Sequence, residues 1–214
     1  GLAATLGVLV AGGAGSGLAL GSRKALVRLG GVTLLERAIA ILADFCDEIV
    51  VSAPSGMVLP LTDVARASPG SCAIRRADDP AGTVGPLAGM VAGLSSAGFE
   101  RAIVLGVDMP FMESAMLVAL IERLGGRHAV VPAPGGFPQP LAAAYARAAG
   151  PILASCLDAG ERSPTRALGS LDVLVLNDAE LAHLPGGLGS FLNLNSPADL
   201  GQAQRRIAVG ETSA

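Results

Sequence analysis

The chain has 214 residues, enough to bury a substantial hydrophobic core within one domain. Its formal net charge is −3, and its 15 basic residues are scattered singly or in pairs, so the basic stripe expected of a nucleic-acid-binding protein is missing. Aromatic residues make up 3 % of the chain, which leaves few side chains on which nucleic-acid bases could stack.

The cysteines and histidines offer little material for metal or triad chemistry. Cys46, Cys72 and Cys156 are odd in number, far apart and match no zinc-ligand spacing, so we expect neither a disulfide nor a structural metal. His128 and His183 stand alone, which argues against a histidine-based triad or a histidine-ligated metal. Each is predicted to be a strand or loop histidine with a local partner.

The first 22 residues carry no charge, which raises the question of a signal peptide or a membrane span. A signal peptide needs a basic region before its apolar core. A spanning helix needs about 20 predominantly apolar residues, whereas this segment loses its apolar character by Gly12. We therefore expect a cytoplasmic protein with no membrane partner.

A glycine-rich segment follows a short apolar run that begins at Thr5 and is predicted to form a buried strand. Glycines allow positive φ angles and let backbone N–H groups approach an anion without a Cβ in the way. Lys24 can place a positive charge on the same anion. The segment therefore predicts a polyphosphate-binding loop, with a flexible linker as the alternative. Its glycines are Gly12, Gly13, Gly15, Gly17 and Gly21.

Two well-known phosphate-binding motifs do not fit this loop. The dinucleotide fingerprint needs a third glycine three residues after the second, and the two possible alignments place Leu18 or Leu20 there. The Walker loop needs Gly-Lys followed by Ser or Thr, but Arg23 precedes Lys24 and Ala25 follows it.

The spacing of apolar residues predicts alternating strands and helices along the rest of the chain. In the first half we predict a helix over 34–45 capped by Thr33, a strand over 48–53, a short helix over 61–67, a strand over 72–75, a helix that begins at Pro86 and a strand over 101–107. The core-facing residues of the first helix are expected to be Leu34, Leu35, Ala38, Ile41 and Leu42.

The second half of the chain is less regular. We predict a helix over 114–124, a strand over 128–132, a turn and strand within 135–145, a helix over 148–158, a polar loop over 159–166, strands over 172–176 and 191–195, and a last helix to Ile207 with Ser196 as its cap and Pro197 in its first turn. This alternation predicts a three-layer α/β/α fold with a mixed, mostly parallel sheet. No repeat or low-complexity linker divides the chain, so we expect one domain over 1–214.

Asp108 follows the predicted strand 101–107. The carboxyl end of a central parallel strand is where open α/β sheets bind ligands. Mg²⁺ usually binds one or two carboxylates together with substrate oxygens, so Asp108 is a candidate magnesium ligand beside the glycine loop. The alternative is a strand-end turn formed with Pro110. Asn193 and Asn195, near the C-terminus, are expected to converge on the same edge.

A series of motifs in one order over most of the chain resembles the MobA family of molybdenum cofactor guanylyltransferases, within the glycosyltransferase-A-like nucleotidyltransferases. The motifs are VAGG at 10–13, Lys24-Ala25-Leu26, GPLAGM at 85–90, VDMP at 107–110, QPLAAAY at 139–145, AGERS at 159–163 and LNLNSPADL at 192–200. The resemblance implies a Rossmann-like nucleotidyltransferase fold.

The resemblance also implies an activity, the transfer of GMP from Mg-GTP to molybdopterin or its molybdenum form. Pyrophosphate would be released, and molybdoenzymes or their chaperones would be further partners. Such a reaction needs positioning and charge neutralisation and no side-chain nucleophile. Two alternatives stay open, namely a non-catalytic nucleotide-binding accessory protein of molybdoenzyme maturation and a related nucleotidyltransferase that uses CTP or another acceptor.

The family motifs carry site residues over to this chain. Nucleotide contacts are implied for Val10, Ala11, Gly12, Gly13, Lys24, Ser52, Asp78, Gly85, Pro86 and Asp108. Asp78 takes the position of an aspartate that reads the guanine edge. Lys24 and Asp108 are the expected catalytic residues, and Asp108 and Asn195 the expected Mg²⁺ ligands. Candidates for acceptor binding are Gln139, Arg162 and Asn193.

The glycine loop departs from the family pattern. The family has an arginine that meets the phosphates where this chain has Ala19, a methionine where it has Leu20, and an aspartate where it has Arg23. Losing a bidentate guanidinium is not a conservative change. Arg23 is the candidate to replace it, and without a replacement the accessory-protein alternative gains weight.

Overall fold

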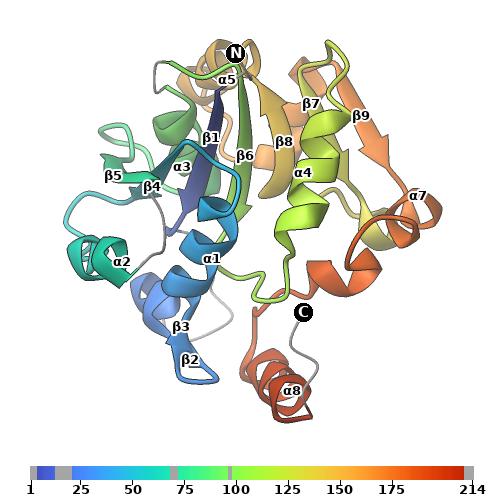
Figure 1. The fold of residues 1–214 in the computed structure, drawn as a ribbon. Coiled ribbons are helices and arrows are strands. Elements are labelled where there is room, and N and C mark those ends of the chain that lie inside the picture. Colours follow the sequence, from blue (N-terminus) through green and yellow to red (C-terminus); the bar gives the residue numbers. More distant parts are fainter. Residues whose placement is uncertain (1–3, 13–20, 68–71, 96–97, 210–214) are drawn as a thin grey trace.

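The computed structural model describes residues 4–12, 21–67, 72–95 and 98–209, without the side chains of 21–23 and 65–67. A seven-stranded sheet with the order β5-β4-β1-β6-β8-β7-β9 crosses this part of the chain (Figure 1). Its strands are β1 Thr5–Val10, β4 Glu48–Ala53, β5 Ala73–Asp78, β6 Arg101–Gly106, β7 Ala129–Pro132, β8 Ala142–Ala146 and β9 Val173–Leu176. A separate hairpin pairs β2 Arg28–Leu29 with β3 Val32–Thr33.

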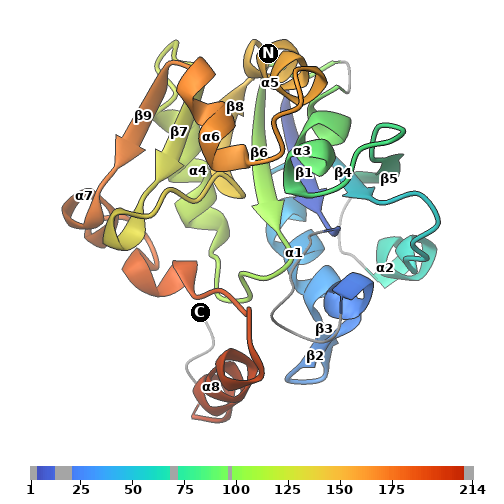
Figure 2. The same cartoon turned by 180° about the vertical axis from the view of Figure 1, so that it is seen from behind.

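Helices cover both faces of this sheet. The α-helices are α1 Leu34–Ala43, α2 Leu61–Ala67, α3 Pro86–Leu94, α4 Ser114–Glu122, α5 Ala149–Asp158, α6 Pro164–Ala167, α7 Asp178–Ala182 and α8 Pro197–Ala208. Short 3₁₀ helices are η1 Gly21–Leu26, η2 Pro134–Gly136, η3 Leu168–Ser170 and η4 Gly187–Phe191. Figure 1 shows α1 and α4 in front of the sheet, and Figure 2 shows α3 and α5 on the opposite face.

The sheet is mixed and mostly parallel, as predicted. Strands β5, β4, β1 and β6 run parallel to one another, and β7 is parallel to β9. Strand β8 is antiparallel to both of its neighbours, β6 and β7. Because β8 is reversed, it begins at the edge where β6 ends, with Ala142 opposite Leu105. The β2–β3 hairpin and α8 lie beyond the same edge (Figures 1 and 2).

The central strands are buried on both faces, which explains their near-continuous apolar sequences. Alternate residues of β1 serve two separate cores, with Leu9 on the side of α1 and α4 and Val8 on the side of α3 and α5. Helix α3 lies very close to β1, because a Cβ on Gly93 would be 2.2 Å from Val8 Cγ1. Glycine at 93 is therefore what permits this helix-to-strand distance.

Several predicted elements are confirmed with the same bounds, notably strand β4 over 48–53 and helix α2 over 61–67. Helix α1 begins at Leu34 after its Thr33 cap, as expected. Of the predicted core-facing residues, Leu34, Leu35, Ala38 and Leu42 are buried, and Ile41 is partly buried and packs against the same core. The prediction missed Ile39, which is fully buried. Position 39 continues the helical face of Leu35 and Leu42, to which it is spaced by four and three residues.

The predicted strand over 191–195 does not form. Residues 187–191 make the 3₁₀ helix η4, and the chain then runs irregularly past the end of the sheet. Phe191 and Leu194 are buried, but the Leu194 amide donates only to Asp108 O (2.9 Å), beyond the last residue of β6. The alternating apolar pattern therefore reflects burial without a strand partner.

Two further differences concern short helices. The polar loop predicted over 159–166 contains the start of α6, with Ser163 as its cap. Helix α7 was not predicted at all.

For His128, the expected local partner is present, because the Asp172 amide donates to His128 Nδ1 at 3.0 Å. None of the described helices combines the length and apolar character that a bilayer span requires.

Candidate functional site

Three of the predicted site residues meet at the carboxyl edge of the sheet. Lys24 Nζ lies 3.1 Å from Asp108 Oδ2 and 3.3 Å from Asn195 Oδ1. The Lys24 and Asp108 side chains are 14 % and 24 % exposed, so their ion pair is partly shielded from solvent. The arrangement places one cation against a carboxylate oxygen and an amide oxygen.

Asp108 reaches this position because β6 ends two residues before it. A Cβ on Gly106 would lie 2.7 Å from Asp108 Oδ1, so only glycine at 106 lets the carboxylate fold back beside the strand end. The backbone carbonyl of Asp108 accepts from the Leu194 amide at 2.9 Å. This bond fixes the C-terminal segment, and with it Asn195, against the end of β6.

Asn195 is held by the start of helix α8. The Asp199 carboxylate accepts from the backbone amides of Asn195 (2.9 Å) and Ser196 (2.7 Å), and the Asp199 amide donates to Ser196 Oγ. This capping box orients the residue just before the helix. Hydrogen bonding with the Ser196 side chain, and then with the Asn195 amide, lowers the pKa of Asp199, and the nearby Lys24 charge acts in the same direction.

The donor set fits a magnesium ion. Asp108 and Asn195 both direct a hard oxygen at one cationic group, the Lys24 ammonium. Within the described ranges, no cluster of three or more His, Cys, Asp or Glu residues could enclose a metal. A single carboxylate is enough for Mg²⁺ when substrate phosphates and water supply the other ligands.

The predicted nucleotide contacts at the first strand are partly described. Val10 ends β1, Ala11 follows it, and the Ala11 amide donates to the Ser52 carbonyl at 2.9 Å. Gly12 packs on Pro54, whose Cδ would be 2.2 Å from a Cβ at position 12. Packing against Pro54 therefore requires glycine at position 12, independently of any contact with a ligand. Gly13 and the Arg23 side chain lie outside the described residues.

The other predicted nucleotide contacts lie around the start of helix α3. Gly85 caps the helix with φ 105°, a backbone angle that favours glycine, and Pro86 is its first residue. Asp78 ends β5 with a side chain that is 57 % exposed, and its Oδ1 accepts from Arg76 Nε at 2.7 Å. The aspartate expected to read a base is therefore a solvated, paired group at the sheet edge.

Asp79, next to Asp78, is a buried acidic residue that the sequence analysis did not name among the candidate site residues. Its residue is 8 % exposed, and neither carboxylate oxygen has a hydrogen-bond partner. Burial, and then the charge of Asp78, raise the pKa of Asp79 to about 6, while Arg76 opposes this shift. The sequence held one indication of this burial. Successive residues of an extended chain point to opposite faces, so of two adjacent acids such as Asp78 and Asp79 one can face solvent while the other faces the interior.

Two of the three acceptor candidates are neighbours. Asn193 Nδ2 lies 3.5 Å from Gln139 Oε1, and Gln139 precedes the reversed strand β8. The Gly106 amide donates to the Leu141 carbonyl at 2.8 Å, which holds this segment against the end of β6. The reversal of β8 thus brings residues just before it to the edge where Asp108 lies.

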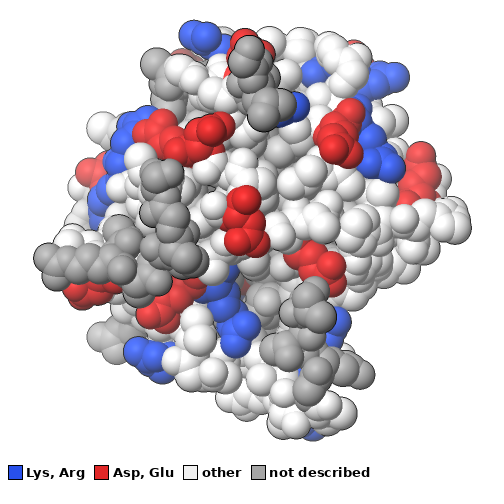
Figure 3. All heavy atoms as spheres, in the orientation of Figure 1, with Lys and Arg blue, Asp and Glu red and all other residues white. Residues whose placement is uncertain are grey.

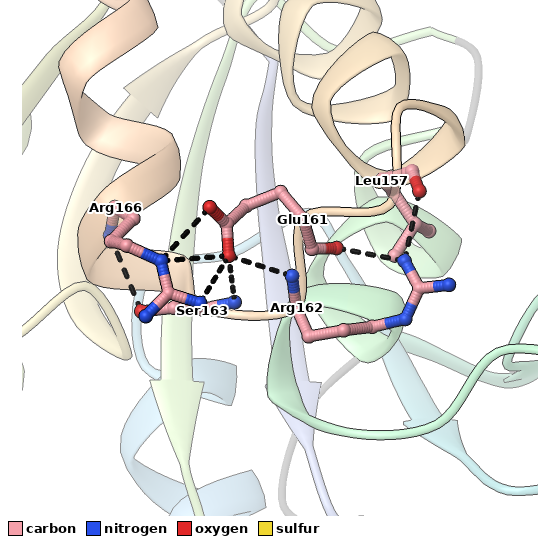
Figure 4. Close-up of polar contacts among 5 residues, drawn as sticks. All are labelled: Leu157, Glu161, Arg162, Ser163 and Arg166. Atoms are coloured by element: carbon pink, nitrogen blue, oxygen red, sulfur yellow. Dashed lines mark hydrogen bonds and ion pairs between the residues drawn. The ribbon is translucent and has the colours of Figure 1, made fainter.

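Arg162 is held elsewhere by its own loop. Its Nη1 donates to the carbonyls of Leu157 (2.9 Å) and Glu161 (2.8 Å), and Figure 4 shows the loop organised by the Glu161 carboxylate. Glu161 accepts from the Arg166 side chain and from the amides of Ser163 and Arg162. These bonds, the Arg166 bond first, lower the pKa of Glu161 to about 2. No described contact joins Arg162 to Lys24 or Asp108.

The surface around the site carries both signs of charge. On the face with α1 and α4, Figure 3 shows acidic and basic side chains interspersed, with wide uncharged areas between them. Among the described residues on that face, no single sign forms a broad patch. The local field at the site therefore comes from its own few charged groups.

Comparison with known sequences matches residues 7–173 to the family described as the MobA-like NTP transferase domain. A probable molybdenum cofactor guanylyltransferase from Natronomonas pharaonis is 32 % identical over 206 residues, which cover 94 % of this chain and 98 % of that protein. The molybdenum cofactor guanylyltransferase from Desulfosudis oleivorans is 29 % identical over 211 residues, covering 98 % and 99 %.

Solved structures share the fold. Molybdopterin-guanine dinucleotide biosynthesis protein A from Archaeoglobus fulgidus has a TM-score of 0.77 and 26 % identity, covering 96 % of this chain and 99 % of its own. The 4-diphosphocytidyl-2C-methyl-D-erythritol synthase from Anaerococcus prevotii has a TM-score of 0.74 at 14 % identity and covers 96 % of both chains. The second likeness is one of fold alone.

Proposed function

This chain belongs to the MobA-like NTP transferase family, and from that membership we propose that it transfers GMP from GTP to molybdopterin, forming the guanine dinucleotide cofactor and pyrophosphate. Relatives that match nearly the whole chain carry the name molybdenum cofactor guanylyltransferase. The structural observation that carries the proposal is the contact of Lys24 with Asp108 and Asn195.

The proposed reaction depends on neutralising negative charge on the phosphates and on positioning the substrates, and it needs no covalent intermediate with the protein. An oxygen of the acceptor's terminal phosphate attacks the α-phosphorus of GTP, the bond from that phosphorus to the bridging oxygen breaks, and the electron pair leaves with pyrophosphate. Negative charge gathers on the phosphate oxygens during this step. Lys24 supplies a fixed positive charge, and positioning the two substrates supplies much of the remaining acceleration.

Asp108 and Asn195 would hold Mg²⁺ through one carboxylate and one amide oxygen. When bound, the ion supplies charge neutralisation and orientation of the triphosphate. Lys24 would then give up its contact with Asp108 and turn its ammonium group to the phosphates. The partly buried setting of the pair, with side chains 14 % and 24 % exposed, strengthens such interactions relative to bulk water.

The acceptor proposal rests on amide chemistry. Gln139 and Asn193 lie together at the carboxyl edge, and their amides can both donate to and accept from a pterin. Arg162 stays a candidate for the acceptor phosphate, but its loop bonds would have to rearrange to bring the guanidinium to the site.

The proposal is tested by incubating the protein with GTP, Mg²⁺ and molybdopterin and measuring pyrophosphate. We expect turnover by the wild type and a loss of about 10³-fold or more in Asp108→Ala, because the metal ligand and the partner of Lys24 are both removed. Asp172→Ala, which breaks a surface ion pair with Arg127, is the matched control and should keep full activity.

Different results would select the alternatives. GTP binding by calorimetry without pyrophosphate release would indicate an accessory nucleotide-binding protein, in keeping with Ala19 at the position of the family's arginine. Preferred turnover of CTP in competition among the four NTPs would move the substrate away from guanine. Unchanged turnover in Asp108→Ala would remove the basis of the proposed site.

A further inference from the structure

Arg206, near the end of helix α8, contacts two other segments of the chain. Its guanidinium carbon lies 4.2 Å from the centroid of the Phe111 ring, and its Nη1 donates to the Gly189 carbonyl at 3.1 Å. A Cβ on Gly189 would lie 3.3 Å from Arg206 Nη2, so a side chain there would crowd the guanidinium. A planar guanidinium can stack on an aromatic ring and donate a hydrogen bond at the same time. One side chain therefore joins α8, η4 and the segment that follows β6.

The two contacted segments lead to the proposed metal ligands. Phe111 is 4 % exposed and follows Asp108 by three residues. Gly189 belongs to η4, which precedes Asn195 along the chain. Arg206 thus links the part of the chain that carries Asp108 to the part that carries Asn195, and it does so from the far end of α8.

Helix α8 is held by few apolar contacts. Figures 1 and 2 show it set apart from the sheet. Of its 12 residues only Ala203 is buried, and Ile207 is half-buried, close to the turn of the β2–β3 hairpin. The capping box at Ser196 fixes only the first turn. Arg206 lies about 15 Å farther along the helix axis, at about 1.5 Å per residue. An element with little buried apolar surface opens easily, so a single anchor at its far end matters.

We propose that Arg206 is a positioning residue for the magnesium site, because it holds α8 and η4 against the segment after β6 and so keeps Asn195 beside Asp108. The inference rests on the proposed function, since it takes Asp108 and Asn195 as the ligands of Mg²⁺. The Leu194 amide, which donates to the Asp108 carbonyl at 2.9 Å, is the direct link that the anchor supports. Without the anchor a smaller fraction of molecules has both oxygens in place, which lowers the apparent affinity for the ion.

The neighbouring Arg205 provides a matched control. Both arginines lie in the last turn of α8, where a cation interacts favourably with the helix dipole, so removing either one loses the same contribution. Arg205 is exposed, and its Nη1 lies over its own helix, 3.5 Å from where a Cβ on Gly201 would be. A difference between Arg206→Ala and Arg205→Ala therefore reports the contacts with Phe111 and Gly189.

The first measurement uses the protein without nucleotide or metal. Hydrogen exchange of the Leu194 amide, followed by nuclear magnetic resonance, reports how often the Asn195 segment leaves Asp108. We expect exchange about 5–50-fold faster in Arg206→Ala and unchanged in Arg205→Ala, because only the first loses a cation–π contact and a hydrogen bond. Arg206→Lys keeps the charge without the planar group, and it serves in place of Arg206→Ala if that variant does not fold.

The second measurement is pyrophosphate release as a function of free Mg²⁺ at saturating GTP and molybdopterin. Arg206→Ala should raise the half-saturating Mg²⁺ concentration by about 5–50-fold and keep the rate at saturating Mg²⁺ within about twofold of the wild type, since the bound ion restores the ordered segment. Arg205→Ala should change neither value. A residue that only stabilises the fold would lower the unfolding midpoint and leave the Mg²⁺ dependence of the folded protein unchanged.

Two outcomes would overturn the inference. The first is equal exchange and equal Mg²⁺ dependence in Arg206→Ala and Arg205→Ala, which would show that the contacts with Phe111 and Gly189 anchor nothing. The second is faster exchange with an unchanged Mg²⁺ dependence, which would leave Arg206 a structural residue. A wild type that releases no pyrophosphate from any NTP would overturn the proposed function instead, and exchange at Leu194 would still decide whether Arg206 anchors the Asn195 segment.

Discussion

At Asp79, the ionised carboxylate destabilises the folded chain. Burial and Asp78 raise its pKa from 3.8 to about 6, against the opposing effect of Arg76. Since the folded pKa exceeds the unfolded one, the folded state binds the proton more tightly. The stability from this group is fully present below the unfolded pKa and is lost as pH rises through about 6.

We therefore expect Asp79→Asn to raise the free energy of unfolding by about 1–2 kcal/mol at about pH 7.5 and to leave it nearly unchanged at about pH 3.5. This range is lower than the full pKa shift would give, because partial solvation screens the charge. Urea unfolding at both pH values measures the difference, with the surface variant Asp172→Asn as control. Destabilisation at neutral pH would instead mean that Asp79 holds α3 in place.

Sequence motifs predicted Lys24, Asp108 and Asn195 as individual residues, but their contact depends on distant parts of the chain. Lys24 is separated from Asp108 by 84 residues and from Asn195 by 171. Only the order of the strands, with β1 beside β6, brings them together. The burial of Asp79 beside the exposed Asp78 could not be predicted from sequence, because which of two adjacent acids is buried depends on the packing of α3.

Among the elements, helix α3 depends most closely on a missing side chain. We expect Gly93→Ala to lower the free energy of unfolding by about 1–3 kcal/mol, because its Cβ would lie 2.2 Å from Val8 Cγ1 on β1. Gly169→Ala is the matched control, since nothing lies within 4 Å of its Cβ and its φ is not positive. Denaturant midpoints compare the two. Equal midpoints would show that α3 can move away from β1.

Helix α8 allows a second test of how one residue stabilises a single element. Ser196→Ala removes the capping side chain and should reduce stability by about 1 kcal/mol. Ser155→Ala in α5, where the hydroxyl only donates back to the Pro151 carbonyl, should change stability little. Thermal melting measures both variants. A loss in Ser155→Ala as large as in Ser196→Ala would argue against capping as the cause.

Prediction of elements from the sequence succeeded where burial and periodicity agree and failed at the C-terminal edge. Strand β4 is apolar and buried, and its bounds were predicted. The pattern over 191–195 is typical of a strand because Phe191 and Leu194 are buried, but no strand within the described part of the chain pairs with it. Helix α7 has only five residues, and its capping box of Asn177 and Glu180 was its one local signal.

For the whole molecule, both hydrophobic cores share the same central strands. Residues of β1, β4 and β6 alternate between the two sides of the sheet, so losing either core exposes the other. We propose that residues 1–214 form one domain and expect a single unfolding transition. Far-ultraviolet circular dichroism and the signal of the fully buried Tyr145 should give the same midpoint. Separate midpoints would indicate two independently folding parts.

In the proposed reaction, the ammonium group that already neutralises Asp108 would make nucleotide entry an exchange of counterions. An incoming triphosphate with its divalent ion would gain Lys24 only as Asp108 gives it up. The measured affinity is then the difference between two sets of electrostatic contacts, and added salt weakens both of them. The affinity of this protein for its nucleotide should accordingly vary less with ionic strength than the charge of the ligand alone would suggest.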